Sequence, residues 1–383
     1  MFEQAEALRE VGAGIQLSPN GMKVLRALGL ERAVLERGFL PEALEMRMGE
    51  SGRRVFSLPI RTAAPYRWRA PYVHIHRADL IDILARALSE RAPDALRLGA
   101  AVETVSEDGQ SLTLKGGERV EGSAVLAADG LRSALRGQIF GHQPARYTGM
   151  IAWRATVPLA ALGEAAPPPT ACVWAGEGRH VVTYHLSRRG LVNVVGVVEQ
   201  ALDDPAALDS WQTVGRREDA LDDFAGWDPV ITRLFAAAPN LSRWALFDRP
   251  ASPDWVVGSM ALVGDAAHPM LPTFAQGACQ GLEDAWTVAA LASGSASIPD
   301  ALSRYAALRQ PRTAMIQQRA LRNATNFHLG PGRERRRRYA AMALGGRLLP
   351  WLARGRLDEI YGYDAVQEAA AAANAVSAVS VTR

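Results

Sequence analysis

The densest group of residues able to do chemistry lies in the stretch ALVGDAAHPMLPTFAQGACQGLEDA, residues 261–285. An apolar run ends there at Gly264 and Asp265, which predicts a buried strand with an acidic residue at its carboxyl end. Ligands bind at that edge of an open parallel sheet, so Asp265 could accept hydrogen bonds from ligand hydroxyls. Pro272 then turns the chain, and a helix opens with small residues whose free N–H groups favour an anionic or carbonyl-bearing ligand. A tight strand-to-helix turn with Asp265 as a cap explains the spacing equally well.

A second group of chemically capable residues lies in RHVVTYHL, residues 179–186, whose β-branched and aromatic content predicts a strand. His180 and Tyr184 are four residues apart and therefore share one face of that strand. A histidine with a near-neutral pKa is suited to take a proton from a phenol. Same-face pairs of this kind usually serve packing, so the spacing alone does not make the pair catalytic.

Composition and charge narrow the class of protein. The chain has 383 residues, of which 48% are hydrophobic and 22% charged, with a net charge of +3. These values are ordinary for a globular protein long enough for two domains. The basic run RERRRR at 333–338 lacks interleaved aromatic residues, so it indicates a solvated helix face and no nucleic-acid partner.

The cysteines and the apolar pattern predict a cytoplasmic protein. Cys172 and Cys279 lie far apart, without the spacing of a metal site, which favours a reducing compartment and no metal. We interpret Cys172 as a small buried hydrophobic residue. No signal peptide and no membrane-spanning apolar run is present, so no membrane span is expected.

The elements expected to position these groups change character along the chain. Helical spacing occurs at 20–28, 31–37 and 76–88, and a continuous apolar run at 123–130 indicates a buried parallel strand. Residues 147–199 are strand-like, and residues after 300 are helical. We therefore expect an α/β nucleotide-binding segment in two pieces, 1–146 and 251–300, a mostly β substrate domain at 147–250, and a helical region at 301–383.

Several ordered stretches resemble the flavoprotein aromatic hydroxylases, the single-component FAD-dependent monooxygenases. GDAAHP…QGACQGLEDA is similar to their second FAD motif, and LAADGLRSALR, residues 126–136, resembles their DG motif. EVGAGIQLSPNGMKVLRALGL, HRADL and YGYDA extend the resemblance over nearly the whole chain. The branch containing salicylate hydroxylase, 3-hydroxybenzoate 6-hydroxylase and 6-hydroxynicotinate 3-monooxygenase looks closest. The resemblance implies a Rossmann-like layer of the glutathione-reductase type, interrupted by the β domain.

The resemblance also implies which residues hold the nucleotide half of FAD. Glu3 would bind the adenosine ribose, and Arg77 would meet the pyrophosphate. Val102 would lie beside the adenine through its backbone, and Asp129 would sit near the phosphates.

For the flavin half, the resemblance implies that Asp265 binds the ribitol chain. Gly277, Ala278 and Cys279 would offer backbone N–H groups to the flavin pyrimidine edge. Such groups stabilise negative charge on reduced flavin. His268 is interpreted as a structural residue of the loop after Asp265.

The implied reaction is hydroxylation of a small phenolic or hydroxypyridine carboxylic acid with NADH or NADPH and O2, with loss of the carboxylate left open. His180 would act as general base on the substrate hydroxyl, and Tyr184 would orient it. An Arg154 side chain facing the cavity could pair with a substrate carboxylate. Pro272 departs from 3-hydroxybenzoate 6-hydroxylases, which carry a catalytic Gln there, so that reaction is disfavoured. The resemblance allows a homodimer.

Two rival interpretations remain from the sequence. One is a flavin epoxidase or polyketide-tailoring hydroxylase of the same fold. The other is an inactive fragment unable to hold FAD, because family members carry G-x-G-x-x-G about 20 residues before the acidic ribose residue and nothing comparable precedes Glu3. We expect an N-terminally truncated FAD-binding segment, with Met1 standing for a valine within the second strand, and weak FAD binding or insolubility for the chain alone.

Overall fold

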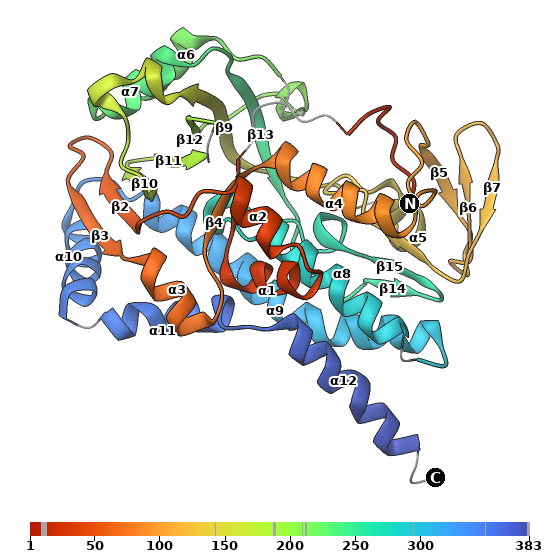
Figure 1. Cartoon of the computed structure of the whole chain (residues 1–383). Coiled ribbons are helices and arrows are strands. Elements are labelled where there is room, and N and C mark those ends of the chain that lie inside the picture. The colour runs from red at the N-terminus through yellow and green to blue at the C-terminus, as the bar shows by residue number, and fades with distance from the viewer. Residues whose placement is uncertain are drawn as a thin grey trace.

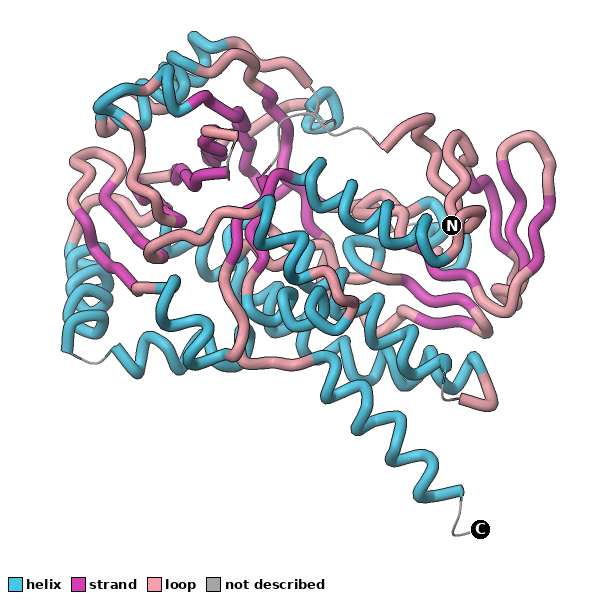
Figure 2. The backbone as a smooth tube through the Cα atoms, viewed as in Figure 1, coloured by secondary structure: helices cyan, strands magenta, loops and turns pink. Residues whose placement is uncertain are grey.

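A computed structural model describes residues 1–8, 14–141, 143–186, 189–208, 210, 213–293, 295–348 and 350–380 (Figure 1). The largest sheet crosses the upper part of the molecule in this view, and helices α8 and α9 run beneath it. Figure 2 shows smaller groups of strands beside these helices and a last helix, α12, that extends away from the body of the molecule.

The large sheet has seven strands in the order β13-β9-β12-β11-β10-β2-β3. Neighbouring strands are antiparallel except β10 and β2, which are parallel. Its strands in chain order are β2 Leu44–Met48, β3 Arg54–Leu58, β9 Arg146–Pro158, β10 Ala171–Gly176, β11 Arg179–Leu186, β12 Leu191–Glu199 and β13 Ser242–Asp248.

The two faces of this sheet carry different residues, because successive side chains along a strand point to opposite sides. One face carries residues such as Trp153 and Val181 and packs under α6 (Arg217–Asp223) and α7 (Pro229–Ala237). Gly196 lets an aromatic ring approach on this side, since a Cβ there would lie 2.6 Å from Phe224 Cζ. The opposite face carries Met150, Val197 and Leu246 and packs against the loop before α8 and the C-terminal part of α9.

A separate group of strands forms the nucleotide-binding type of layer. β8 (Val125–Ala127) and β15 (Met260–Leu262) are parallel neighbours, with Leu262 opposite Ala127, and β14 (Val256–Val257) pairs antiparallel with β15. The loops that begin after these two parallel strands therefore leave from the same edge. A meander of β5 (Val102–Val105), β6 (Ser111–Leu114) and β7 (Arg119–Glu121), and a pair of β1 (Gly14–Leu17) with β4 (Val73–His76), complete this part.

Helices fill the space around these sheets. They are α1 Pro19–Ala27, α2 Glu31–Arg37, α3 Ile60–Trp68, α4 Arg77–Arg91, α5 Ala134–Phe140, α8 Gly277–Ser293, α9 Ile298–Phe327, α10 Arg333–Leu348, α11 Pro350–Tyr361 and α12 Ala365–Ser380. Short 3-10 turns occur at η1 Leu159–Ala161, η2 Gly163–Ala165, η3 Pro205–Leu208, η4 Gly264–Ala266 and η5 Pro272–Phe274. With 30 residues, α9 is about 45 Å long. It can therefore contact both the large sheet and the parallel pair.

Most elements expected from the sequence are present. The helices expected at 20–28, 31–37 and 76–88 correspond to α1, α2 and α4 within one to three residues at each end, and the buried parallel strand within 123–130 is β8. The basic run at the start of α10 is mostly exposed, as expected for a solvated face. No helix in the described ranges is long and apolar enough to cross a membrane.

The large sheet extends beyond the residues expected to build it. The sequence pattern placed the substrate sheet within 147–250, whereas β2 and β3, at 44–58, are hydrogen-bonded into it beside β10. Their contribution was hidden because a parallel partner from a distant segment leaves no periodic signal of its own.

Candidate active site

The loop after β8 is shaped by short-range hydrogen bonds. Asp129 Oδ2 accepts a hydrogen bond from Leu135 N at 3.3 Å, and Gly130 has a φ of +77° that favours glycine. Ser133 caps α5 by accepting a hydrogen bond from Arg136 N at 2.9 Å. The Asp-Gly-x-x-Ser spacing therefore builds a turn that opens directly into a helix.

Arg136 ties this loop to the loop after β15. Its Nη1 donates to Ala266 O at 3.0 Å, and the side chain is buried. The two loops that leave the parallel pair are therefore held together by one guanidinium group. Because Nη1 also donates to Ala267 O at 3.4 Å, this side chain fixes the backbone just after Asp265.

Asp265 lies beside the start of α8. The residue is exposed, yet desolvation by the surrounding protein raises the pKa of its carboxyl group, an effect that His268 and Arg77 oppose. A Cβ on Gly277 would lie 3.8 Å from Asp265 Oδ1, so a side chain at that position would fill the space between them. Ala275 has a φ of +52° just before the helix, a strained conformation that often marks functional loops.

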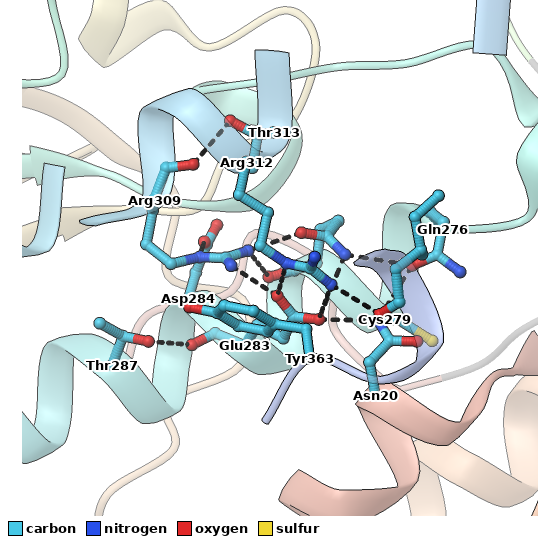
Figure 3. Close-up of polar contacts among 12 residues, drawn as sticks. Asn20, Gln276, Cys279, Glu283, Asp284, Thr287, Arg309, Arg312, Thr313 and Tyr363 are labelled. Atoms are coloured by element: carbon cyan, nitrogen blue, oxygen red, sulfur yellow. Dashed lines mark hydrogen bonds and ion pairs between the residues drawn. The ribbon is translucent and has the colours of Figure 1, made fainter. Parts of the chain in front are cut away.

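The start of α8 is anchored by a buried network of charges (Figure 3). Arg309 of α9 donates to Asp284 Oδ1 at 2.8 Å and to Glu283 Oε2 at 2.5 Å. Arg312 donates to both oxygens of Glu283, at 2.7 and 2.8 Å. All four side chains are buried, so their charges must be paired within the protein.

The same network reaches α1. Asn20 Nδ2 donates to Glu283 Oε1 at 2.7 Å and to Gln276 Oε1 at 3.0 Å. Gln276 Nε2 donates to Ser18 Oγ at 2.8 Å, and the Ser18 hydroxyl lies 3.4 Å from Cys279 Sγ. The residues just before and within the first turn of α8 are thus tied to the SPN turn that begins α1. The Cys279 thiol is buried, which raises its pKa.

His268 is part of this network, in line with its interpretation as a structural residue. Its Nε2 lies 2.5 Å from Asp284 Oδ2, and the same oxygen accepts a hydrogen bond from Gly264 N at 2.9 Å. Asp284 thereby fixes both ends of the short turn that carries Asp265.

Because Asp284 is paired in this network, the free energy of unfolding should depend on pH in the acidic range. Burial alone would raise the pKa of Asp284, but His268 and Arg309 outweigh it and lower the pKa from 3.8 to about 2. A carboxyl group with a lowered pKa stabilises the fold above its unfolded pKa and loses that contribution as pH falls through the folded value. We expect about 2 kcal/mol of unfolding free energy to disappear from this group between pH 4 and pH 2. Urea unfolding over this range checks it, and Asp284→Asn should lack this part of the pH dependence.

The residues expected near the adenosine lie around β5. Phe2 forms an isolated parallel bridge with Arg97, and Glu3 O accepts a hydrogen bond from Ala100 N at 2.8 Å. Phe2-Glu3 therefore has the strand character expected from the sequence. Glu3 Oε1 accepts a hydrogen bond from Ala5 N at 2.9 Å. This bridge places Glu3 beside the segment that leads into Val102.

The remaining expected cofactor residues divide between two loops and α8. Arg77 is the first residue of α4, and its charge acts on Asp265. Gly277, Ala278 and Cys279 form the first turn of α8, where Ala278 is exposed and Cys279 is buried. Arg77 and the start of α8 thus lie near Asp265, while Asp129 lies on the neighbouring loop.

His180 and Tyr184 share one face of β11, as their spacing predicted, and both are buried. They have different neighbours. The Tyr184 ring lies 4.9 Å from the His74 ring, and a Cβ on Gly14 would lie 2.7 Å from the Tyr184 hydroxyl oxygen. His180 instead packs against the end of α9, where its Nδ1 lies 2.6 Å from His328 Nε2.

One expectation for His180 is wrong. A near-neutral pKa was expected for His180, whereas burial and the neighbouring His328 lower the pKa of this residue well below 6.5. The reason is that a charged imidazole in this environment loses its hydration. His180 is therefore a neutral imidazole at physiological pH.

Arg154 lies on the same face of the sheet. It pairs with Val195 across β9 and β12, and its guanidinium stacks 4.7 Å from the centre of the Trp244 ring. Burial raises the pKa of Tyr184, and Arg154 opposes this effect. A cation and a phenolic hydroxyl therefore share one region of the sheet.

Sequence reasoning missed the partners that complete these sites. Arg309, Arg312, His328 and Glu199 were assigned no role. The Arg309 and Arg312 positions at i and i+3 on a predicted helix gave one weak signal, because arginines there share a face. Their acidic partners were visible only as part of a motif.

The residues around the start of α8 could hold a dinucleotide that carries a flavin. The N–H groups in the first turn of a helix have no partners within the helix. Because Gly277 has no side chain, the N–H groups at the start of α8 stay accessible beside Asp265. Asp265 offers a carboxylate to ligand hydroxyls, and Arg77 offers a positive charge to phosphates. The residues present therefore match the chemistry of FAD.

Comparison with protein families decides the identification. The model of the FAD-binding domain family matches residues 3–320. The chain belongs to the FAD-binding domain family. The order of motifs seen in the sequence is therefore that of a flavoprotein, and FAD is its cofactor.

Known relatives place this flavoprotein among aromatic hydroxylases. It is 36% identical to 3-amino-4-hydroxybenzoate 2-monooxygenase of Streptomyces platensis over 370 residues, covering 95% of this chain and 90% of the relative. It is 34% identical to 6-hydroxynicotinate 3-monooxygenase of Bordetella bronchiseptica, covering 74% of each. A solved salicylate hydroxylase substrate complex superposes with a TM-score of 0.76 and 27% identity, covering 94% of this chain and 90% of that chain. The expected family membership and fold are confirmed.

Replacement of Asp265 tests whether its carboxylate contributes to FAD binding. We expect Asp265→Ala to weaken FAD binding by about 10- to 100-fold, because hydrogen bonds to a charged group are worth about 1.5–3 kcal/mol. Titration of the apoprotein with FAD, followed by flavin fluorescence, measures the change. Asp203→Ala, at an exposed aspartate in the loop after β12, should leave the affinity unchanged. Equal affinities for Asp265→Ala and wild type would contradict the assignment.

Proposed function

We propose that this flavoprotein hydroxylates a small phenolic or hydroxypyridine carboxylic acid, using NADH or NADPH and O2. The observation that carries the proposal is the packing of β1 against both the first turn of α8 and Tyr184 on β11. Cys279 Sγ of α8 lies 3.9 Å from Gln16 O of β1, and Gly14 of the same strand is packed against Tyr184. The strand β1 therefore lies between the first turn of α8, where the flavin is proposed to bind, and the face of β11 that carries Tyr184 and His180.

The proposed division of labour follows the two parts of the molecule. Segments 1–146 and 251–300 would hold FAD, and the sheet of residues 147–250, extended by β2 and β3, would hold the aromatic substrate. The proposed cofactor-binding residues are Glu3, Arg77, Val102, Asp129, Asp265, Gly277, Ala278 and Cys279. Bound FAD supplies the redox chemistry by which an oxygen atom of O2 is made available to the ring.

The polar residues of the sheet face have distinct roles in this proposal. His180, neutral at physiological pH, accepts the proton of the substrate hydroxyl, which makes the ring more electron-rich. Burial raises the pKa of Tyr184, so its hydroxyl stays protonated and can donate a hydrogen bond that orients the substrate. Arg154 pairs with the substrate carboxylate, for which its planar guanidinium is suited.

The substrate class is supported by the relatives' names. Each of the aromatic acids named for them, 3-amino-4-hydroxybenzoate and 6-hydroxynicotinate, carries a ring hydroxyl and a carboxylate. A face that offers a neutral base and a guanidinium matches both groups. Phenols that lack the carboxylate should therefore bind more weakly.

Substrate-stimulated oxidation of NADH or NADPH tests the proposal. The FAD-loaded protein is mixed with 3-amino-4-hydroxybenzoate, 6-hydroxynicotinate, salicylate and 3-hydroxybenzoate, and products are identified by mass spectrometry. We expect at least one acid to stimulate oxidation and to gain one oxygen atom from O2. An FAD-loaded protein that hydroxylates no member of a broad panel of phenolic and hydroxypyridine acids would disprove the proposal.

A further inference from the structure

A chain of three polar groups leads from the substrate face of β11 to the protein surface. His180 Nδ1 lies 2.6 Å from His328 Nε2, and His328 Nδ1 lies 2.7 Å from Glu199 Oε1. His180 and His328 are both buried, whereas 58% of the Glu199 side chain is exposed. The chain thus begins at the proposed general base and ends in solvent.

The fold holds these groups in place from three directions. His328 is the C-terminal cap of α9, with its N–H bonded to Ala324 O at 3.2 Å. Its carbonyl accepts a hydrogen bond from Gly178 N at 3.2 Å, and Gly178 O accepts one from Glu199 N at 2.8 Å. The end of α9, the turn before β11 and the end of β12 are therefore linked where the three side chains meet.

Glu199 and His328 also line a surface cleft of about 690 Å³, between the start of β9 and the end of α9. This volume holds many water molecules, since one occupies about 30 Å³ of liquid. A proton that reaches Glu199 can therefore pass directly to solvent.

The hydrogen bonds assign a tautomer to each histidine. An ionised carboxylate only accepts hydrogen bonds, so His328 Nδ1 must carry a proton and donate to Glu199. His328 Nε2 is then an acceptor, which requires a proton on His180 Nδ1. This leaves a free lone pair on His180 Nε2, the form that a general base needs.

We propose that His180, His328 and Glu199 form a proton relay that carries the substrate's hydroxyl proton to solvent, with His328 and Glu199 as positioning residues for the base. This inference rests on the proposed function, because it takes His180 to be the base. Every other group in the relay follows from the distances above.

The proton movements balance along the three groups. The substrate O–H bond breaks and its proton binds His180 Nε2, while the Nδ1 proton of His180 moves to His328 Nε2. The Nδ1 proton of His328 moves to the Glu199 carboxylate, which releases it to water. One proton leaves in total, each ring ends in its other tautomer, and a proton returning by the same route restores both.

The relay explains how a buried histidine can serve as base. Burial lowers the pKa of both His180 and His328, so neither ring holds an added proton well. Passing the proton onward avoids a lasting buried cation. Other charged groups around the relay are Arg146 and Asp248, which line the same cleft, and Glu177 in the turn before β11, which lies beside Gly330 of that cleft.

Ionisation of a bound phenol tests the relay without catalytic turnover. The probe is 3-amino-4-hydroxybenzoate, mixed with the oxidised, FAD-loaded protein in a stopped-flow spectrometer between pH 6 and pH 8. Its ultraviolet absorbance reports conversion of phenol to phenolate. In His328→Gln we expect ionisation to slow by at least about tenfold, a part of the effect of a general base, with the dissociation constant nearly unchanged.

Two further variants separate a relay from a general electrostatic effect. Glu199→Gln removes the final acceptor and should slow ionisation, whereas Glu177→Gln removes an exposed charge beside Gly330 and should not. Added imidazole should restore the rate in His328→Ala, because a small diffusible base can replace the missing ring. Ionisation at the wild-type rate in both His328→Gln and Glu199→Gln overturns the relay.

The outcome for His180→Gln distinguishes the two proposals. If this variant alone loses ionisation, His180 is the base and the relay is wrong. If it ionises the probe at the wild-type rate, the proposed function of His180 is wrong. Nitrogen-15 spectra of the protein without substrate give an independent test of the relay, which requires Nδ1–H on both His180 and His328; Nε2–H on both rings would overturn it.

Discussion

Replacement of His180 by alanine is expected to lower kcat for hydroxylation of a phenolic acid by about 10²- to 10⁴-fold, the usual contribution of a general base. His180 is buried on the proposed substrate face of β11, and its pKa is lowered by burial, so it is neutral and able to accept a proton. Removal of the ring leaves the substrate hydroxyl without an acceptor. Steady-state kinetics with the best substrate of the panel measures the effect, and KM should change little.

The control for this variant is another histidine on the same strand. His185 points to the opposite face, where its Nε2 contacts Pro167 O at 2.9 Å. His185→Gln should retain kcat within about threefold, because its side chain lies on the face of β11 away from the proposed base, and surface or loop contacts of this kind change stability by only about 1 kcal/mol. An epoxidase that acts on an olefin would not need His180, so unchanged kcat in His180→Ala would favour that rival.

The second large effect is on stability. Arg309→Leu should lower the free energy of unfolding by about 3–5 kcal/mol, because it leaves Glu283 and Asp284 with buried charges that lose a partner. Arg309 is fully buried and donates to both carboxylates. Urea unfolding monitored by circular dichroism measures the difference. FAD affinity should fall as well, since the start of α8 depends on the same network.

Arg322→Leu provides a matched control on the same helix. Arg322 is exposed, and its contact is a 3.3 Å hydrogen bond to Gln318. Its loss should change stability by no more than about 0.5 kcal/mol. A similar small change in Arg309→Leu would show that the buried network does not anchor α8.

Local patterns predicted the elements and the exposed surface well. The periodicity of residues 76–88 predicted α4, and the continuous apolar run at 123–130 predicted the buried strand β8. These features depend on neighbours in sequence, so a short window contains the information needed. The resemblance of the 261–285 segment then identified the family, which the match over residues 3–320 confirmed.

Membership of the large sheet was only partly predictable. The strands β9 to β12 follow one another and show their alternation openly, whereas β2 pairs with β10 although Leu44 and Ala171 are 127 positions apart. A parallel pairing between distant segments depends on how the intervening chain folds. The sequence analysis therefore assigned no strands of this sheet to residues 44–58.

The sequence by itself determined which residues can do the chemistry: Asp265 at a strand end, small residues opening α8, and His180 with Tyr184 on one face of a strand. Only the tertiary structure decided their surroundings. It brought Arg309 to Glu283 and Asp284, and it placed His328 and Glu199 beside His180. The physical reason is that pKa values and proton paths depend on burial and on contacts between distant segments, which residue spacing does not specify.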